Sequence, residues 1–475
     1  MSRIKQLFQT TRFKRGTYSS GLTVLVLAIA IVFNLVVQQL PENLTTIDLT
    51  ENGLYTLGDQ TKEILGNLDE DITIYHVVQS GNELEMITKI LNQYAALSGR
   101  IKVKQLDPVV NPVQLKEYDA SNLSENSLIV ESGKRFKTVS YSDIVEVDYS
   151  DYYTYGSDPY YSFDGEGEIT SAIDYVMTDD LPKMYIVTGH GEQSLPYALT
   201  SSLEKNNIET EDLTLIAQDA VPEDCDVLAV MAPSTDYTEE EIGLIRSYLE
   251  QGGKLLAVCN YTENDMANLY GLLSEYGLDI GQGIVMELGK NNYTQHPVYL
   301  LPELASQQIT TPIVNENMLV LTPYALPMTV QEELREGLTV ENLLTTTTDS
   351  FASADYDLQK TEKGSEDAQG PFTVGAAVTN ETENGTAQLV VYSTFYPFLS
   401  DYLQITPANA DLFVNSVSWM CGQKSTVEIY AKSIGTTSNT VPAATTNFWT
   451  IIFVAALPAG ILAAGFAVWI RRRRK

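Results

Sequence analysis

The chain has 475 residues, 44% of them hydrophobic, and a formal net charge of −33 from 62 acidic and 29 basic residues. That hydrophobic fraction is typical of a globular protein and excludes both a disordered chain and a many-helix membrane protein. The acidic excess repels phosphate backbones, which argues against nucleic acid as a partner. Three cysteines without C-x-x-C or Cys/His ligand spacing give no redox motif or zinc site, so we expect no metal and no cofactor.

Both ends of the chain have the composition of membrane-spanning helices. Residues 18–38 and 448–470 carry no charge, and about 20 such residues cross ~30 Å of hydrocarbon. The flanking basic residues in 1–17 and 471–475 predict cytoplasmic termini, with the rest of the chain outside the cell membrane. The alternatives are a cleaved signal peptide and a buried core helix. The first segment lacks a small-x-small cleavage site, and the second ends in four arginines and a lysine.

Residues 39–147 alternate between strand-like and helical patterns. Apolar periodicity and turn signals predict a short helix that is capped by Thr56 or Asp59 and runs to Leu65. They also predict a strand at 72–78, a helix at 83–98, a strand at 101–106, a helix at 112–118, and a hairpin of 127–130 with 135–140. The strand and helix order from residue 72 onward, β-α-β-α-β-β, resembles a thioredoxin-like domain without its C-x-x-C.

Residues 148–180 are expected to form a Tyr- and Asp-rich linker that is loop-like as far as residue 168. Asp164-Gly-Glu-Gly-Glu168 could be imagined as a calcium loop, but the pattern D-x-[DN]-x-[DN]-G is absent and a solvated loop is favoured. The tyrosines form either an exposed loop or a carbohydrate- or protein-binding surface. They are Tyr149, Tyr152, Tyr153, Tyr155, Tyr160 and Tyr161.

Residues 181–425 alternate between buried strands and amphipathic helices, which predicts a parallel sheet covered on both faces. The predicted strands are 183–188, 225–231, 254–258 and 387–392. Thr238 and Glu241 fit the capping box T-x-x-E at the start of one helix. Residues 426–447 are expected to be a linker to the second membrane segment.

Three motifs in this order resemble the GldG-type auxiliary proteins of ABC transport systems. They are LTTIDLTENGLYTLGDQTKEIL at 44–65, EITSAIDYV with LPKMYIVTGHGE within 168–192, and VVYSTFYPFLSDYL with NADLFVNSVSWMCG within 390–422. The resemblance implies association with a membrane permease and an ATPase. It also implies a class I glutamine amidotransferase-like (flavodoxin-like) domain that lacks catalytic residues.

The candidate contact loop is Gly189-His190-Gly191-Glu192, at the end of a predicted strand where α/β sheets carry ligand sites. The alternative is a tight turn whose side chains cap the next helix. Cys259 also follows a strand, but the glycines of a G-x-C-x-G nucleophile elbow are absent. Residues 283–291 only approach G-x-x-x-x-G-K-[ST], so we expect no ATPase site and no catalytic residues.

The sequence therefore predicts a non-enzymatic, membrane-anchored auxiliary subunit of an ABC-2-like transport system. Its external domains would bind substrate, cell envelope or partner subunits. The alternative is a membrane-tethered hydrolase or carbohydrate-binding protein that acts alone at the cell surface.

Overall fold

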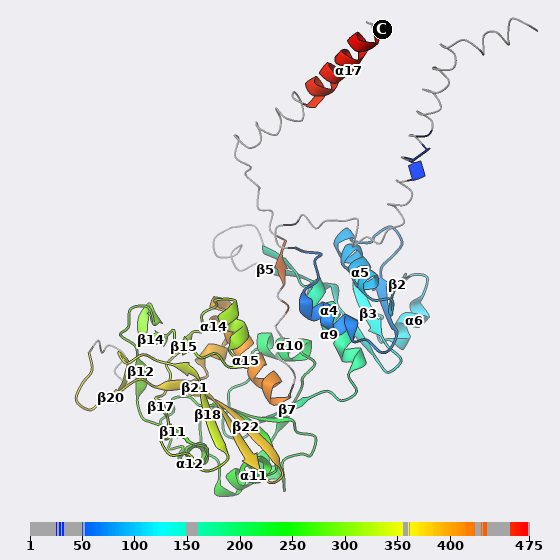
Figure 1. The fold of residues 1–475 in the computed structure, drawn as a ribbon. Coiled ribbons are helices and arrows are strands. Elements are labelled where there is room, and N and C mark those ends of the chain that lie inside the picture. The colour runs from blue at the N-terminus through cyan, green and yellow to red at the C-terminus, as the bar shows by residue number, and fades with distance from the viewer. Residues whose placement is uncertain are drawn as a thin grey trace, which may run out of the picture. The chain divides into compact units, whose positions relative to one another are not determined.

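The computed structural model of the chain describes residues 53–148, 160–354, 362–422 and 457–473, together with residues 25, 28, 29, 31, 32, 50, 360, 429 and 431–434. The helices and strands are labelled in Figure 1, and the chain divides into two compact units by its internal contacts. One unit comprises residues 1–146 and 163–432, and the other comprises residues 147–162 and 433–475. The first unit contains a small mixed sheet and a large one, which are described in turn.

The small sheet has the strand order β2-β1-β3-β4. Its strands are β1 (Ile72–Val77), β2 (Ile101–Leu106), β3 (Ser127–Glu131) and β4 (Phe136–Val139), and its helices are α4 (Asp59–Gly66), α5 (Glu85–Leu97), α6 (Pro112–Glu117) and α7 (Tyr141–Ile144). Strands β1 and β2 are parallel and the other pairs are antiparallel. Helix α5 buries Ile87, Ile90, Leu91 and Tyr94, the stripe expected of an amphipathic helix. The predicted elements of this region are confirmed.

The expected loop over residues 148–168 is wrong at its C-terminal end. Strand β6 (Tyr160–Phe163) leads into helix α9 (Gly165–Met177), which begins inside the glycine-rich motif. Glycine has a low helix propensity, but α9 packs Ile169, Ile173 and Val176 into the core beside β3 and β4. Tertiary packing therefore overrides the local signal. Of the tyrosines noted above, Tyr160 and Tyr161 lie in β6 and the other four fall outside the described residues.

The large sheet has ten strands and the order β11-β17-β21-β22-β10-β9-β7-β8, with β15 and β18 joined to one side. Five neighbouring strands are parallel: β7 (Lys183–Val187), β8 (Glu209–Leu213), β9 (Val227–Met231), β10 (Lys254–Val258) and β22 (Gly385–Tyr392). The predicted parallel sheet is confirmed in these strands.

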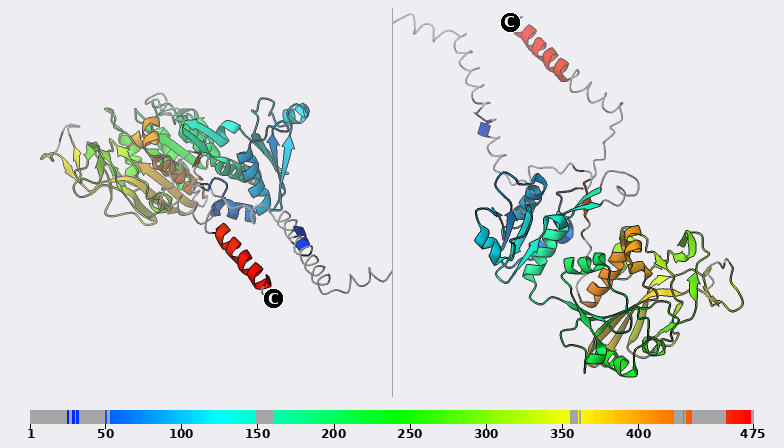
Figure 2. Two further views of the ribbon diagram at one scale, coloured as in Figure 1. Left: turned by 90° about the horizontal axis from the view of Figure 1, so that it is seen from above. Right: turned by 180° about the vertical axis from the view of Figure 1, so that it is seen from behind.

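Helices cover both faces of the parallel strands. One core contains apolar residues of α10 (Tyr197–Lys205) and α15 (Ala408–Met420). The other contains apolar residues of α11 (Glu239–Glu250) and α12 (Ala267–Glu275). Figure 2 shows this layered arrangement from two further directions. Buried strands with helices on each face explain why the strand sequences are continuous apolar runs.

Antiparallel strands extend the large sheet, and most of them were not predicted from the sequence. They are β11 (Leu278–Ile280), β15 (Glu303–Leu304), β17 (Met328–Val330), β18 (Leu338–Thr345) and β21 (Thr373–Thr382). Two small sheets are β12 (Ile284–Met286) with β19 (Phe351–Ser353) and β20 (Ala368–Gln369), and β13 (Tyr293–Thr294) with β14 (His296–Leu300) and β16 (Thr322–Pro323). A third joins β5 (Val145–Asp148), β6 and β23 (Lys432–Ser433). The remaining helices are α13 (Thr311–Asn315), α14 (Ser400–Ile405), η1 (Leu215–Ala217) and η2 (Tyr396–Phe398).

The predicted membrane segments are described only in part. Most of residues 18–38 and all of 448–456 lie outside the described residues, and α17 (Leu457–Arg473) covers the rest of the second segment. Among the residues that are described, no helix combines the length and apolarity needed to cross a membrane.

Candidate functional site

The chain reverses direction across the parallel sheet between β7 and β9. From β7 it passes through α10 to β8 at one edge, and it then returns to form β9 on the other side of β7. Ligands of open α/β sheets bind at such a switch point, outside the carboxyl ends of the strands. The predicted contact loop Gly189–Glu192 follows β7, and residues 232–238 follow β9. Both loops therefore lie at the position where this architecture places sites.

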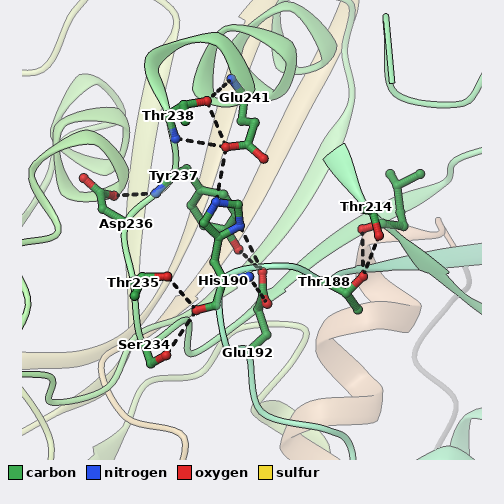
Figure 3. Close-up of polar contacts among 11 residues, drawn as sticks. Thr188, His190, Glu192, Thr214, Ser234, Thr235, Asp236, Tyr237, Thr238 and Glu241 are labelled. Atoms are coloured by element: carbon green, nitrogen blue, oxygen red, sulfur yellow. Dashed lines mark hydrogen bonds and ion pairs between the residues drawn. The ribbon is translucent and has the colours of Figure 1, made fainter. Parts of the chain in front are cut away.

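Direct hydrogen bonds connect these two loops (Figure 3). The backbone N–H groups of Ser234 and Thr235 both donate to the carbonyl oxygen of His190 at 3.0 Å. The hydroxyls of the same two residues donate to that oxygen at 3.2 and 3.1 Å. Further along the loop, Gln193 N–H donates to Met231 O at 2.8 Å. The backbone of the predicted contact loop is thus fixed to the chain that follows β9.

The imidazole of His190 lies between two buried carboxylates. Its Nε2 is 3.3 Å from Glu241 Oε2, and its Nδ1 is 3.8 Å from Glu192 Oε1. The exposed fractions of the three side chains are 15% for His190, 4% for Glu192 and 3% for Glu241. The ring of Tyr237 lies beside the imidazole with 4.3 Å between centroids. These side chains point toward one another, as Figure 3 shows, and are largely buried, so they are poorly placed to touch a large partner.

Glu192 is held by two further donors. Its Oε2 accepts the backbone N–H of His190 at 2.8 Å, and its Oε1 accepts the hydroxyl of Tyr237 at 2.8 Å. Burial, followed by the nearby Glu192 carboxylate, raises the pKa of Tyr237 far above its usual value. The phenol therefore stays protonated and remains a donor to Glu192 at every physiological pH.

Glu241 has a second role at the start of α11. Its Oε2 accepts Thr238 N–H at 3.0 Å, and its own N–H donates to Thr238 Oγ1 at 3.2 Å. This reciprocal pair is the predicted capping box, which is confirmed. The helix cap and the His190 contact share one carboxylate. His190 Nδ1 and Glu241 Oε1 are buried without a hydrogen-bond partner in the described part of the chain.

Two glycines allow the loop to make this turn. Gly189 has φ of +127° and Gly191 has φ of +71°, both in the region that favours glycine. A Cβ on Gly191 would lie 2.1 Å from Ser234 Oγ. Gly191 therefore permits both the turn and the close approach of the second loop. The exposed part of the loop is its glycine backbone, and its role as a contact loop stays a prediction.

Sequence analysis did not identify the partners of the loop that come from beyond β9. Ser234, Thr235 and Tyr237 have no motif of their own. Their position was nevertheless deducible, because neighbouring parallel strands end at the same edge of a sheet. Glu241 was identified for its capping role alone.

Cys259 follows β10 at the same edge of the sheet, and its side chain is buried. Burial raises the pKa of its thiol to about 12. A reactive cysteine needs a lowered pKa, because the thiolate is the nucleophile. This thiol is protonated at neutral pH and does not have the environment of an activated nucleophile. Cys225 and Cys421 are also free thiols.

The histidines of the chain stand in separate structural contexts. His76 lies on β1 and its Nε2 is 3.0 Å from Asn126 Oδ1, whereas His296 lies on β14. Within the ranges that the structure describes, no group of three His, Cys, Asp or Glu side chains is arranged to hold a metal ion.

Several solved structures are similar to this chain at low identity. The N-terminal domain of mmIFT52 is 14% identical with a TM-score of 0.38, and the match covers 50% of this chain and 96% of that one. PurLQS from Thermotoga maritima is 13% identical with a TM-score of 0.28, over 50% and 99% of the two chains. A ThuA-like protein from Parabacteroides merdae is 10% identical with a TM-score of 0.28, over 54% and 98%. At these TM-scores the likenesses carry no argument about function.

Family comparisons cover two stretches of the chain, and no curated protein matches it. Residues 51–146 match a domain of unknown function. Residues 181–388 match the family described as an ABC-type uncharacterized transport system. That stretch contains the whole switch-point site, from β7 through α11. This match is consistent with the resemblance of the chain to GldG-type auxiliary proteins.

Proposed function

We propose that the chain is a non-enzymatic, membrane-anchored subunit that works beside the permease and the ATPase of an ABC-2-like transport system. The observation that carries the proposal is the family match over residues 181–388, which supports an auxiliary role in ABC transport. A direct test is recovery of a permease and an ATPase with the tagged full-length chain from membranes solubilised in mild detergent. Recovery of neither would contradict the proposal.

Anchoring by both ends of the chain rests on the sequence. Residues 18–38 and 448–470 carry no charge. Basic residues lie between each of these segments and the nearer end of the chain. A maleimide that does not cross membranes is then expected to label a cysteine introduced at Ser157 in intact cells but not one introduced at Ser2. The reverse pattern would overturn this topology.

The external region is proposed to consist of two α/β domains. The sheet order β2-β1-β3-β4 supports the thioredoxin-like domain expected over residues 39–147. Helix α9 packs against this sheet, so the proposed domain also includes residues 165–177. The parallel order β8-β7-β9-β10-β22 supports an amidotransferase-like, flavodoxin-like domain over residues 181–425. Neither needs catalytic residues to serve as a binding or coupling element.

The contact loop is proposed to act through its backbone. Gly189 and Gly191 are exposed, whereas the carboxylates of Glu192 and Glu241 are buried. Glycines allow a partner's backbone to approach closely. The bonds from Ser234 and Thr235 hold the loop in one shape before any partner binds, which lowers the entropy cost of binding.

One observation argues against a solitary hydrolase and a second against an ATPase. The Cys259 thiol is buried and its pKa is raised to about 12, the opposite of an activated nucleophile. The near-match to a phosphate-binding loop spans residues 283–291. Within it, residues 284–286 form strand β12, which pairs with β19, whereas a phosphate-binding loop is irregular and leads into a helix. In the proposed mechanism, cytoplasmic ATP hydrolysis moves the permease helices, and this protein transmits or gates that motion outside the membrane.

A further inference from the structure

The motif Asp164-Gly-Glu-Gly-Glu168 begins helix α9, and two of its carboxylates are buried. Glu166 is 5% exposed and Asp164 is 4% exposed. Negative charge is favoured at a helix N-terminus, but burial of a carboxylate also requires partners. Those partners come from segments that are far apart in the sequence.

Glu166 connects the two ends of the first compact unit. Its Oε1 accepts Thr61 Oγ1 at 2.8 Å and Gly58 N–H at 2.5 Å. Its Oε2 accepts the ammonium of Lys432 at 2.8 Å. One carboxylate therefore binds both the start of α4 and the chain that returns from the large sheet.

The Lys432 ammonium has two further acceptors near the start of the described chain. It donates to Gly53 O at 3.0 Å and to Thr56 O at 2.7 Å. With Glu166, these acceptors match the three donors of an ammonium group. The Lys432 side chain is only 20% exposed, and all three of its donors have acceptors. The Lys432–Glu166 pair therefore differs from an ordinary surface ion pair.

A second cation makes a similar pair with the first residue of the motif. Lys205, at the end of α10, forms an ion pair with Asp164 and also donates to the carbonyl oxygen of Ile429 at 3.4 Å. A Cβ on Gly167 would lie 2.4 Å from Asp164 Oδ1 and 2.9 Å from Ile429 O. The second glycine of the motif thus leaves room for the returning chain.

We propose that residues 164–168 form an intramolecular docking site for Ile429 and Lys432, and that this clasp opens as a local unit while the large sheet stays folded. Its meaning for transport rests on the proposed function. Along the sequence, Gly53 and Lys432 are the clasp residues that lie nearest to the predicted membrane segments 18–38 and 448–470. A relative displacement of the membrane helices would act on the clasp first.

The local nature of the clasp follows from its chemistry. Removal of one partner of a buried ion pair leaves an uncompensated charge, which favours opening of the segments that the pair holds. The five parallel strands of the large sheet share none of these contacts. A broken clasp is therefore expected to release residues 53–58 and 431–434 together, including the pairing of β23 with β6, while the large sheet stays folded.

The test is hydrogen–deuterium exchange on the purified full-length chain in detergent. Lys432→Met keeps the length of the side chain and removes its charge, and Gly167→Ala crowds the docking site. We expect both variants to raise amide exchange in residues 53–58 and 431–434 by about tenfold or more, with strands β9 and β10 unchanged. The matched control is Lys62→Met, which removes an exposed ion pair with Asp59 in the same region.

Two results would overturn the clasp. If Lys432→Met leaves amide exchange in residues 53–58 and 431–434 unchanged, the ion pair does not hold these segments together. If exchange rises equally in β9 and β10, the ion pair stabilises the whole fold and not a local unit. The measurement needs no partner protein. If exchange rises as expected but the chain recovers no permease, the proposed function is rejected and the clasp stands. If the chain recovers a permease but exchange is unchanged, the clasp is rejected and the proposed function stands.

Discussion

The imidazole Nε2 of His190 lies 3.3 Å from Oε2 of Glu241, a carboxylate that also caps helix α11. The loop after β7 and the first turn of α11 are thus connected by a single side chain. We expect the two residues to be energetically coupled. In a double-mutant cycle of His190→Ala and Glu241→Gln, the coupling free energy of unfolding should be about 0.5–3 kcal/mol.

The control cycle for this coupling uses Arg246 and Glu275, an exposed pair in which the guanidinium binds the carboxylate twice. Exposed pairs contribute about 0–1 kcal/mol. If the His190–Glu241 coupling is no larger than that of the control pair, the imidazole does not couple the loop after β7 to helix α11, and only the backbone bonds from Ser234 and Thr235 hold that loop.

Gly191→Ala should destabilise the protein by about 1–3 kcal/mol, because the new Cβ would meet Ser234 Oγ and φ at this residue is +71°. The matched control is Gly243→Ala on α11, where a Cβ would meet no atom within 4 Å. Alanine has the higher helix propensity, so the control should be neutral or stabilised by up to ~1 kcal/mol. Thermal unfolding of both variants checks the prediction, and equal midpoints would contradict it.

Asp164 predicts a pH dependence of stability. Burial raises its pKa to about 7, although the Lys205 ammonium opposes the shift. A carboxyl whose pKa is raised in the folded state binds its proton more tightly there than in the unfolded chain. Its contribution to stability is therefore complete below pH ~4 and is lost as the pH rises through about 7.

Asp164→Asn removes that titration. Relative to wild type, this variant should gain stability on the order of 2 kcal/mol between pH 5 and pH 8. Urea unfolding at several pH values measures the difference. A difference that is constant with pH would show that Asp164 stays ionised beside Lys205.

The Cys259 thiol should be inert in the folded protein. It is buried and its pKa is raised to about 12, so a maleimide at pH 7.5 is expected to modify it only after unfolding in urea. A cysteine introduced at Tyr261, which is 42% exposed, is the accessible control. Rapid modification of Cys259 in the native chain would instead support an activated nucleophile and the hydrolase alternative.

Much of the fold could be predicted where the sequence is regular. Strands such as Val227–Met231 are continuous apolar runs because helices cover both faces of the sheet, and T-x-x-E marked the start of α11. The antiparallel strands β18 and β21 lie in a stretch without helical spacing and pair over a long sequence separation. Helix α9 was missed because two glycines in its first turn have the signal of a loop.

The candidate site could be predicted only in position. GHGE at the end of a strand indicated the correct edge of the sheet, and β7 ends at Val187, with one residue between it and the motif. The inward direction of His190 and Glu192 depends on Tyr237 and Glu241, which the chain brings there from beyond β9. Contacts of this kind are set by tertiary packing, and no local pattern records them. The partners of Glu166 were hidden for the same reason.

The most direct test of the auxiliary role is a reciprocal purification from native membranes in mild detergent. The account predicts that a tag on this chain recovers one permease and one ATPase, and that a tag on that permease recovers this chain. The account would be contradicted if the tagged chain recovered neither a permease nor an ATPase and also turned over an amide or glycoside, with the turnover lost in His190→Ala or Cys259→Ala.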